Sequence, residues 1–229
     1  MSDLYAFMNA VGETAVAWIR PDADRFQWTC QCQTTGTADT ATAASLGLNE
    51  HRRTVHMLRL VLIVGPIASG KSTIANTLAA RRRHDGRAVA VLDLDDVVDS
   101  IGGFASLTPD RLRQAQRALG HLVGFWLRRG VDVIAHGPFP QRAEMDTVLA
   151  AVPHGTCISR VLLTATYEAA LERVTGDPDR ALSRDPVFLR QSYQQWDKIL
   201  PKLVGDFTYD TTTMSPGQIV EDLARVILE

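Results

Sequence analysis

The sequence predicts an α/β protein: a doubly wound, three-layer domain built on a parallel sheet, preceded by an N-terminal extension. Two observations support this fold class. Strand and helix patterns alternate from about residue 57 to the end of the chain. Several strand patterns are almost unbroken apolar runs, such as Leu60–Val64 and Val131–Ala135, and such runs are typical of parallel strands that helices cover on both faces.

The predicted elements follow one another as strand, helix, strand. We expect strands at about residues 58–64, 87–93, 131–136, 157–164 and 206–210, and helices at about 71–84, 109–129, 141–151, 167–175, 186–201 and 215–228. Right-handed crossovers between parallel strands then give a doubly wound sheet. Ligands of such sheets lie beyond the carboxyl ends of the strands, so functional residues are expected there.

Residues 1–56 differ in composition from the rest, and we expect a second part of the chain, residues 57–229, to form the main domain. A short helix is expected within residues 3–20, whereas residues 33–45 contain few large apolar side chains and predict a linker or disorder. Trp18, Phe26 and Trp28 indicate that part of the extension packs on something. The segment is either an accessory extension or an upstream reading of the start codon.

The overall composition is that of a globular protein, with 45% hydrophobic residues among 229 and a net charge of −2. This charge provides no basic field, so nucleic acid is an unlikely partner. No apolar run reaches the roughly 18 residues of a membrane helix. The three cysteines are an odd number and argue against a disulfide framework, so we expect a cytoplasmic protein, as a monomer or a homodimer.

The first strand is followed by Gly65–Ser72, which reads G-x-x-x-x-G-K-S and indicates a phosphate-binding P-loop. Its glycines allow a tight turn whose N–H groups face phosphate oxygens, and the next helix adds its positive dipole end. Lys71 would reach the β- and γ-phosphates, and Ser72 would bind Mg²⁺. The residues expected to bind ATP here are Gly65, Ala68, Ser69, Gly70, Lys71, Ser72 and Thr73.

The second strand ends in two carboxylates, Asp93 and Asp95, which would project to the same side of an extended strand. Near a phosphate site, one such carboxylate can hold Mg²⁺ through water, and another can accept the proton of an attacking hydroxyl or hydrogen-bond the substrate. The alternative is that Asp95 or Asp96 only caps the next helix.

The third strand ends in A-H-G-P-F-P, residues 135–140, which predicts a rigid turn at the same rim. We expect His136, Gly137 and Phe139 to contact the acceptor, with Phe139 forming a wall of its pocket. The alternative is an ordinary strand-to-helix loop with a buried Phe139. His136 is a weaker candidate for the general base than Asp95.

The segment 173–190 carries four arginines: Arg173, Arg180, Arg184 and Arg190. Arginine forks suit phosphate oxygens and the charge that develops in phosphoryl transfer. The segment therefore predicts a lid in which Arg180 or Arg184 neutralises the transferring group. The alternative is a solvated helical hairpin whose arginines pair with its own aspartates.

Two further features are weaker indications. Thr211 follows the last strand and would brace the adenine base, although a plain strand end fits equally well. The helix at 109–129 carries Arg111, Arg113 and Arg117, which form either a solvated stripe or a contact to an anionic acceptor.

Together these residues resemble the small P-loop kinases related to shikimate kinase, gluconate kinase and chloramphenicol phosphotransferase, over about residues 57–229. The resemblance implies a P-loop NTPase fold of the nucleoside monophosphate kinase type, ATP and Mg²⁺ as cofactors, and a small-molecule acceptor. Asp93 and Asp95 are similar to the acidic motif after the second strand of these kinases, which implies that Asp93 assists Mg²⁺ and that Asp95 contacts or deprotonates the acceptor hydroxyl. Arg180 and Arg184 are similar to their lid arginines. Residues 137–139 differ from the acceptor loop of shikimate kinase, so the identity of the acceptor does not carry over.

The sequence therefore predicts an ATP-dependent kinase that acts on a hydroxyl of a small molecule. One rival is a nucleotide-binding regulator or slow ATPase with residues 1–56 as its partner-binding arm. A second rival is a kinase for nucleoside monophosphates or polynucleotide ends, and the net charge of −2 weakens the polynucleotide version.

Overall fold

The computed structural model describes residues 18–30, 34–51, 58–176 and 185–228. The chain divides into two compact units: residues 1–57 together with 153–155, and residues 58–152 together with 156–229.

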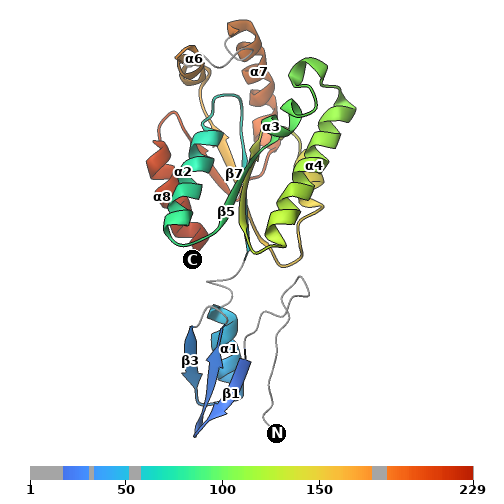
Figure 1. Cartoon of the computed structure of the whole chain (residues 1–229). Coiled ribbons are helices and arrows are strands. Elements are labelled where there is room, and N and C mark those ends of the chain that lie inside the picture. The colour runs from blue at the N-terminus through green and yellow to red at the C-terminus, as the bar shows by residue number, and fades with distance from the viewer. Residues whose placement is uncertain (1–17, 31–33, 52–57, 177–184, 229) are drawn as a thin grey trace. The chain divides into compact units, whose positions relative to one another are not determined.

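The larger unit is built on a five-stranded sheet (Figure 1). Its strands are β4 (Arg59–Val64), β5 (Val89–Asp93), β6 (Asp132–Gly137), β7 (Cys157–Thr164) and β8 (Phe207–Asp210). They lie in the order β5-β6-β4-β7-β8, and every neighbouring pair is parallel. The predicted doubly wound parallel sheet is therefore confirmed.

The helices of this unit are α2 (Lys71–His84), α3 (Leu94–Asp99), α4 (Pro109–Leu127), α5 (Arg142–Leu149), α6 (Tyr167–Thr175), α7 (Pro186–Ile199) and α8 (Pro216–Leu228). Two short 3₁₀ turns, η2 (Phe104–Ser106) and η4 (Leu200–Lys202), complete it. The sequence did not predict α3, η2 or η4, because elements of three to six residues are too short to show a helical period.

The helices cover the sheet in two layers, with α2 and α8 on one face and α4 on the other (Figure 1). Alternate side chains of β4 separate these layers: Leu60 and Leu62 face the core with α4 and α5, whereas Val61 and Ile63 face the core with α2 and α8. All four are at most 2% exposed. Covering on both faces explains why this strand is apolar throughout.

A buried ion-pair cluster lies at the amino end of β6. Asp132 accepts hydrogen bonds from Arg82 at 2.7 Å and from Arg87 at 3.0 Å, and its Oδ1 also accepts the backbone N–H of Arg59 at 3.0 Å. Burial alone would raise the pKa of Asp132, but the hydrogen bonds from Arg87 and Arg82 outweigh it and hold this pKa below its usual value. The cluster joins α2, β6 and the start of β4.

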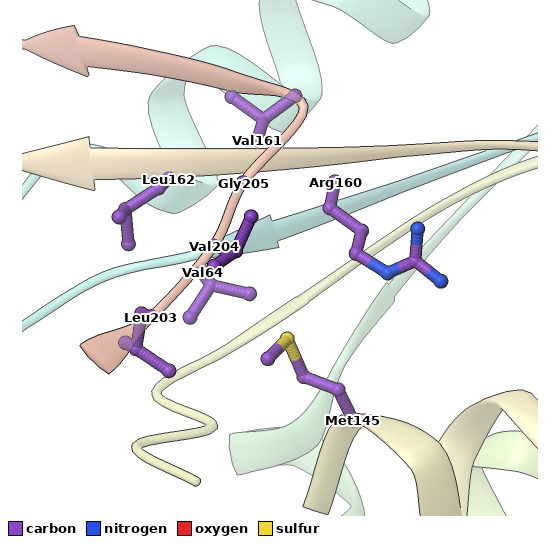
Figure 2. Close-up of a pocket in the computed structure, with 8 residues that line it drawn as sticks. All are labelled: Val64, Met145, Arg160, Val161, Leu162, Leu203, Val204 and Gly205. Carbon is purple, nitrogen blue, oxygen red and sulfur yellow. The ribbon is translucent and has the colours of Figure 1, made fainter. Parts of the chain in front are cut away.

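A small apolar cavity lies between β4, β7 and the loop that enters β8, and Figure 2 shows the residues that line it. Its lining includes Val64, Met145, Leu162 and Leu203, and its volume is about 10 Å³. A cavity of this size holds at most about one water molecule. It is therefore part of the packed interior and offers no space for a substrate.

The N-terminal unit contains a three-stranded antiparallel sheet of β1 (Trp18–Asp22), β2 (Arg25–Thr29) and β3 (Thr35–Ala38), and the helix α1 (Ala41–His51). Two expectations for this part need correction. The expected helix at 3–20 falls mostly outside the described residues, and its last part forms β1 instead. The expected linker at 33–45 contains β3 and the start of α1.

The reason that this linker folds is the indole of Trp28. A Cβ at Gly36 would lie 2.5 Å from the Trp28 ring, and a Cβ at Gly47 would lie 2.9 Å from its Nε1. Small residues therefore let β3 and α1 approach one large side chain supplied by β2. The segment needs few large apolar residues of its own, because Ala44 and Leu48 join the core around Ile19.

The buried cluster predicts that Asp132→Asn destabilises the larger unit. Removing one partner of a buried ion pair typically costs about 3–5 kcal/mol, which urea denaturation would measure. Because the folded pKa of Asp132 is lowered, its stabilisation is fully present above the unfolded value of 3.8 and is lost as the pH falls through the lower folded value. The wild-type chain should accordingly lose more stability than the variant on acidification below that value.

The matched control is Asp110→Asn, which breaks the exposed pair between Asp110 and Arg113. Exposed pairs contribute at most about 1 kcal/mol. Equal losses for the two variants would contradict the structural role of the buried cluster.

Candidate active site

The loop between β4 and α2 has the backbone geometry of an anion-binding turn. A Cβ at Gly65 would lie 2.6 Å from the carbonyl oxygen of Leu163 and 2.7 Å from Ser69 Oγ, so only glycine fits there. Ala68 and Gly70 adopt left-handed conformations, with φ of 56° and 85°. Left-handed residues in a turn gather successive N–H groups into a concavity that suits phosphate oxygens.

Two side chains of the loop complete this geometry. Lys71 Nζ donates to the carbonyl oxygens of Gly65 at 3.1 Å and Pro66 at 2.7 Å, so its side chain folds back over the loop. Ser69 is fully buried, and its Oγ has no hydrogen-bond partner among the residues that the structure describes. Ser72 and Thr73 are exposed in the first turn of α2. These features fit a bound triphosphate.

The acidic pair lies at a strand-to-helix junction. Asp93 ends β5 and caps α3, because its Oδ1 accepts the backbone N–H of Asp95 at 3.0 Å. The helix begins at Leu94, so the expectation that Asp93 and Asp95 share one face of a strand is wrong. The cap is also Asp93 itself and not Asp95 or Asp96.

Sheet register brings the ends of β4, β5 and β6 together. Asp93 pairs with His136 across β5 and β6, and Ile63 pairs with His136 across β4 and β6. His136 is 2% exposed, and its Nδ1 lies 3.4 Å from Asp93 Oδ1. The P-loop and the carboxylates thus meet at one edge of the sheet.

Four side chains at this edge influence one another's charge. Burial raises the pKa of both Asp93 and Asp95, and the charge of Asp93 raises that of Asp95 further, while Lys71 acts in the opposite direction. Burial and then Lys71 lower the pKa of His136 to about 4, so its imidazole is neutral at pH 7. A raised pKa makes the carboxylates of Asp93 and Asp95 stronger bases than ordinary aspartates, whereas the lowered pKa makes His136 a weaker base than an ordinary histidine.

Two of the expected contact residues have other roles. Phe139 is fully buried in the core beneath α4 and α5, so it does not wall an acceptor pocket. Its backbone φ is 37°, and a Cβ at Gly137 would lie 2.9 Å from its ring. The buried-loop alternative therefore describes Phe139, and Gly137 allows the ring to fold under the strand end.

Thr211 is also committed inside the protein. Its Oγ1 donates to the carbonyl oxygen of Thr164 at 3.0 Å and accepts from Arg173 Nη1 at 3.0 Å, and only 8% of the residue is exposed. The hydroxyl is therefore engaged with the protein and not oriented for an adenine base.

The arginine-bearing segment is described only in part. Arg180 and Arg184 lie within residues 177–184, outside the described residues. Arg190 stacks over the ring of Tyr167 at 4.4 Å, and Arg173 donates to the P-loop carbonyl of Ala68 at 2.9 Å. Sequence reasoning missed Tyr193, whose hydroxyl donates to the carbonyl of Ile67 at 2.9 Å. A lone tyrosine in a helix gives no local signal of such a long-range contact.

A groove at the open edge of the sheet reaches Asp93, whereas Asp95 is not among the residues that line it. The groove has a volume of about 780 Å³ between β5, α3 and α4, and its polar lining includes Asp93, Asp96 and His121. Its apolar lining includes Leu122 and Phe125. The groove is large enough for a small molecule.

The described residues contain no group of three or more His, Cys, Asp or Glu side chains placed to hold a metal. The two residues expected to assist Mg²⁺ are Ser72, in the first turn of α2, and Asp93, at the end of β5.

A P-loop follows β4 at the carboxyl edge of this parallel sheet, and a carboxylate ends β5, the next strand along the sequence. This arrangement defines the class of P-loop nucleotide-binding proteins. The family model described as AAA domain (AAA_33) matches residues 60–186, more than half of the 229 residues. The chain belongs to this family.

Sequence comparison finds relatives among kinases. The chain is 28% identical over 113 residues to an adenylyl-sulfate kinase of Bacillus velezensis, covering 49% of this chain and 57% of that kinase. The chain thus spans little more than half the length of this relative.

Structural comparison gives the same fold. The shikimate kinase of Acinetobacter baumannii in complex with shikimate superposes with a TM-score of 0.54 and 20% identity, over 77% of this chain and 96% of that one. The APS kinase of Mycobacterium tuberculosis in complex with AMPPNP and APS superposes with a TM-score of 0.55 and 16% identity, over 76% and 99%. The predicted resemblance to small P-loop kinases is confirmed.

The tight approach at Gly65 predicts that Gly65→Ala weakens ATP binding. The added methyl group meets backbone on one side and a buried hydroxyl on the other, so the loop must shift. Overpacking of about 1–3 kcal/mol corresponds to a loss of roughly 5- to 150-fold in affinity, measurable by calorimetry.

Gly130→Ala is the control. Gly130 has a positive φ of 77°, unlike Gly65, and a Cβ there has open space around it within the described part of the chain. This variant should lose about 1 kcal/mol of stability and bind ATP normally. Unchanged ATP affinity in Gly65→Ala would contradict the proposed phosphate cradle.

Proposed function

We propose that this chain is an ATP-dependent kinase that transfers the γ-phosphoryl group of ATP to a hydroxyl of a small molecule. The observation that carries the proposal is the parallel register of β4, β6 and β5, which brings the P-loop with Lys71 to the same edge of the sheet as Asp93 and Asp95. A cation for phosphate beside a carboxylate that accepts a proton would suit phosphoryl transfer.

The residues of the loop would hold the triphosphate. Backbone N–H groups from Ala68 to Thr73 would face its oxygens, and Lys71 would exchange its loop carbonyls for the β- and γ-phosphates. Ser72 and Asp93 would hold Mg²⁺, which when bound neutralises charge on the phosphates. The kinase relatives support ATP as the phosphoryl donor.

Asp95 would orient the acceptor hydroxyl and accept its proton. Its pKa is raised by burial and by Asp93, which favours proton acceptance near neutral pH. His136 and Gly137 were expected to border the acceptor, but both are buried, so His136 would act behind the carboxylates as a neutral group. Arg180 and Arg184 stay our candidates for neutralising the transferring phosphoryl group.

A library screen tests the proposed reaction. Acceptor-dependent ADP release would be measured with ATP and Mg²⁺ across metabolites and antibiotics that carry hydroxyl groups. We expect ADP release to be stimulated by acceptors of one chemical class and not by the other compounds. ATP hydrolysis that no acceptor stimulates would instead favour a regulatory ATPase.

We expect Asp95→Asn to reduce kcat with the acceptor found in that screen by about 10²–10⁴-fold, the usual contribution of a general base. ATP affinity should stay near the wild-type value, because Lys71 and the loop are unchanged. Asp99→Asn is the control, since Asp99 is exposed at the last position of α3 and does not line the groove, so this variant should lose only a few-fold. A loss below about tenfold for Asp95→Asn would remove Asp95 from the role of base.

We also propose that residues 57–229 carry the kinase activity. A chain that starts at Met57 should keep ATP binding and acceptor-dependent ADP release, because the β4 to α8 core is formed within this part. Calorimetry and the ADP assay on the shortened chain would test this. A shortened chain that is folded but does not bind ATP would place the domain boundary elsewhere.

A further inference from the structure

Two consecutive carbonyl groups of the P-loop are held from outside the loop. Tyr193 of α7 donates its hydroxyl to the carbonyl oxygen of Ile67 at 2.9 Å. Arg173, in the last turn of α6, donates Nη1 to the carbonyl oxygen of Ala68 at 2.9 Å. These two side chains bind the carbonyl oxygens of the loop and do not occupy its backbone N–H groups. Those N–H groups stay available for phosphate oxygens.

The Arg173 fork also ties the loop to the sheet. Its Nη1 donates to Thr211 Oγ1 at 3.0 Å, and its Nη2 donates to the carbonyl oxygen of Thr211 at 2.7 Å. Thr211 in turn donates its N–H and its hydroxyl to the carbonyl oxygen of Thr164 at 2.9 and 3.0 Å. The ends of β7 and β8 thereby fix the position of the guanidinium.

The same region is packed as well as hydrogen-bonded. Ala68 forms a small core with Ala170 and Val174 of α6 and with Leu189 and Tyr193 of α7. Burial raises the pKa of Tyr193 well above its ordinary value, so its hydroxyl keeps the proton that it donates.

The loop needs such support because of its backbone. Ala68 has a φ of 56° although it carries a Cβ. A left-handed conformation costs a non-glycine residue about 1–2 kcal/mol, and it persists only where the surroundings determine it. The carbonyl of Ala68 and the carbonyl before it are the two that Arg173 and Tyr193 hold.

We propose that Arg173 and Tyr193 are positioning residues, which hold the P-loop in its phosphate-binding conformation before any nucleotide arrives. The inference rests on the proposed function only in that the loop binds phosphates, and it does not depend on the acceptor. It differs from a direct role in which Arg173 would contact the base or the ribose of bound ATP.

Inorganic tripolyphosphate separates these two roles, because it contains the phosphates of ATP without the base and ribose. Calorimetry with Mg²⁺ would compare tripolyphosphate and ATP on the full chain. The variants are Tyr193→Phe, which deletes one hydroxyl, and Arg173→Lys, which keeps the charge and loses the fork. The controls are Tyr209→Phe, whose hydroxyl donates to Asp222, and Arg190→Lys, whose guanidinium lies over Tyr167.

We expect Tyr193→Phe to weaken both ligands by the same factor of about fivefold, as the loss of one hydrogen bond predicts. Arg173→Lys should weaken both by about ten- to a hundredfold, because a charge-assisted fork is stronger. The double variant should lose less than the product of the two factors, since each substitution already releases the same turn. Thermal midpoints of variants and controls should agree closely.

Three results would overturn the proposal. A loss for ATP with unchanged tripolyphosphate affinity would mean that Arg173 contacts the base or ribose. A loss in the two controls equal to that in the variants would indicate general destabilisation. Unchanged affinities for both ligands would show that the loop keeps its shape unaided. Failure of the wild-type chain to bind tripolyphosphate would instead contradict the P-loop function itself.

Discussion

The site depends on one backbone constraint, the close approach of the P-loop to the end of β7. At Gly65 the chain passes so near the carbonyl of Leu163 that no side chain fits. The loop must then turn within a few residues, and it does so through the left-handed Ala68 and Gly70. Lys71, Asp93 and His136 are brought together at this turn because parallel register aligns the ends of β4, β5 and β6.

Much of this arrangement is readable in the sequence because its causes are local. Unbroken apolar strands predicted the two-sided sheet, and the spacing from Gly65 to Ser72 predicted the loop. The errors come from residues whose partners are distant or whose element changes. Asp95 does not lie on the strand, because Asp93 caps α3 and this helix begins at Leu94, before Asp95. The sequence predicted Phe139 as a wall of the acceptor pocket, but its ring is buried in the core beneath the turn.

Small residues were the second source of error. Residues 35–38 and 41–51 have little apolar area of their own, yet they fold around Trp28, which lies earlier in the chain. The composition of a segment reports the apolar side chains that it contains, but not the apolar side chains of other segments that pack against it. The hydrogen bonds of Arg173 and Tyr193 to the P-loop were not predicted for a similar reason. A hydrogen bond from a side chain to a carbonyl far away in the sequence produces no spacing pattern.

The position of Tyr193 has a consequence for how this family is compared and recombined. The family match ends at residue 186, whereas Tyr193 lies beyond it and donates to Ile67 inside it. A hybrid that exchanged only the matched region with a relative would place a foreign loop against the native α7. An exchange that keeps this contact must therefore extend beyond the matched segment and include Tyr193.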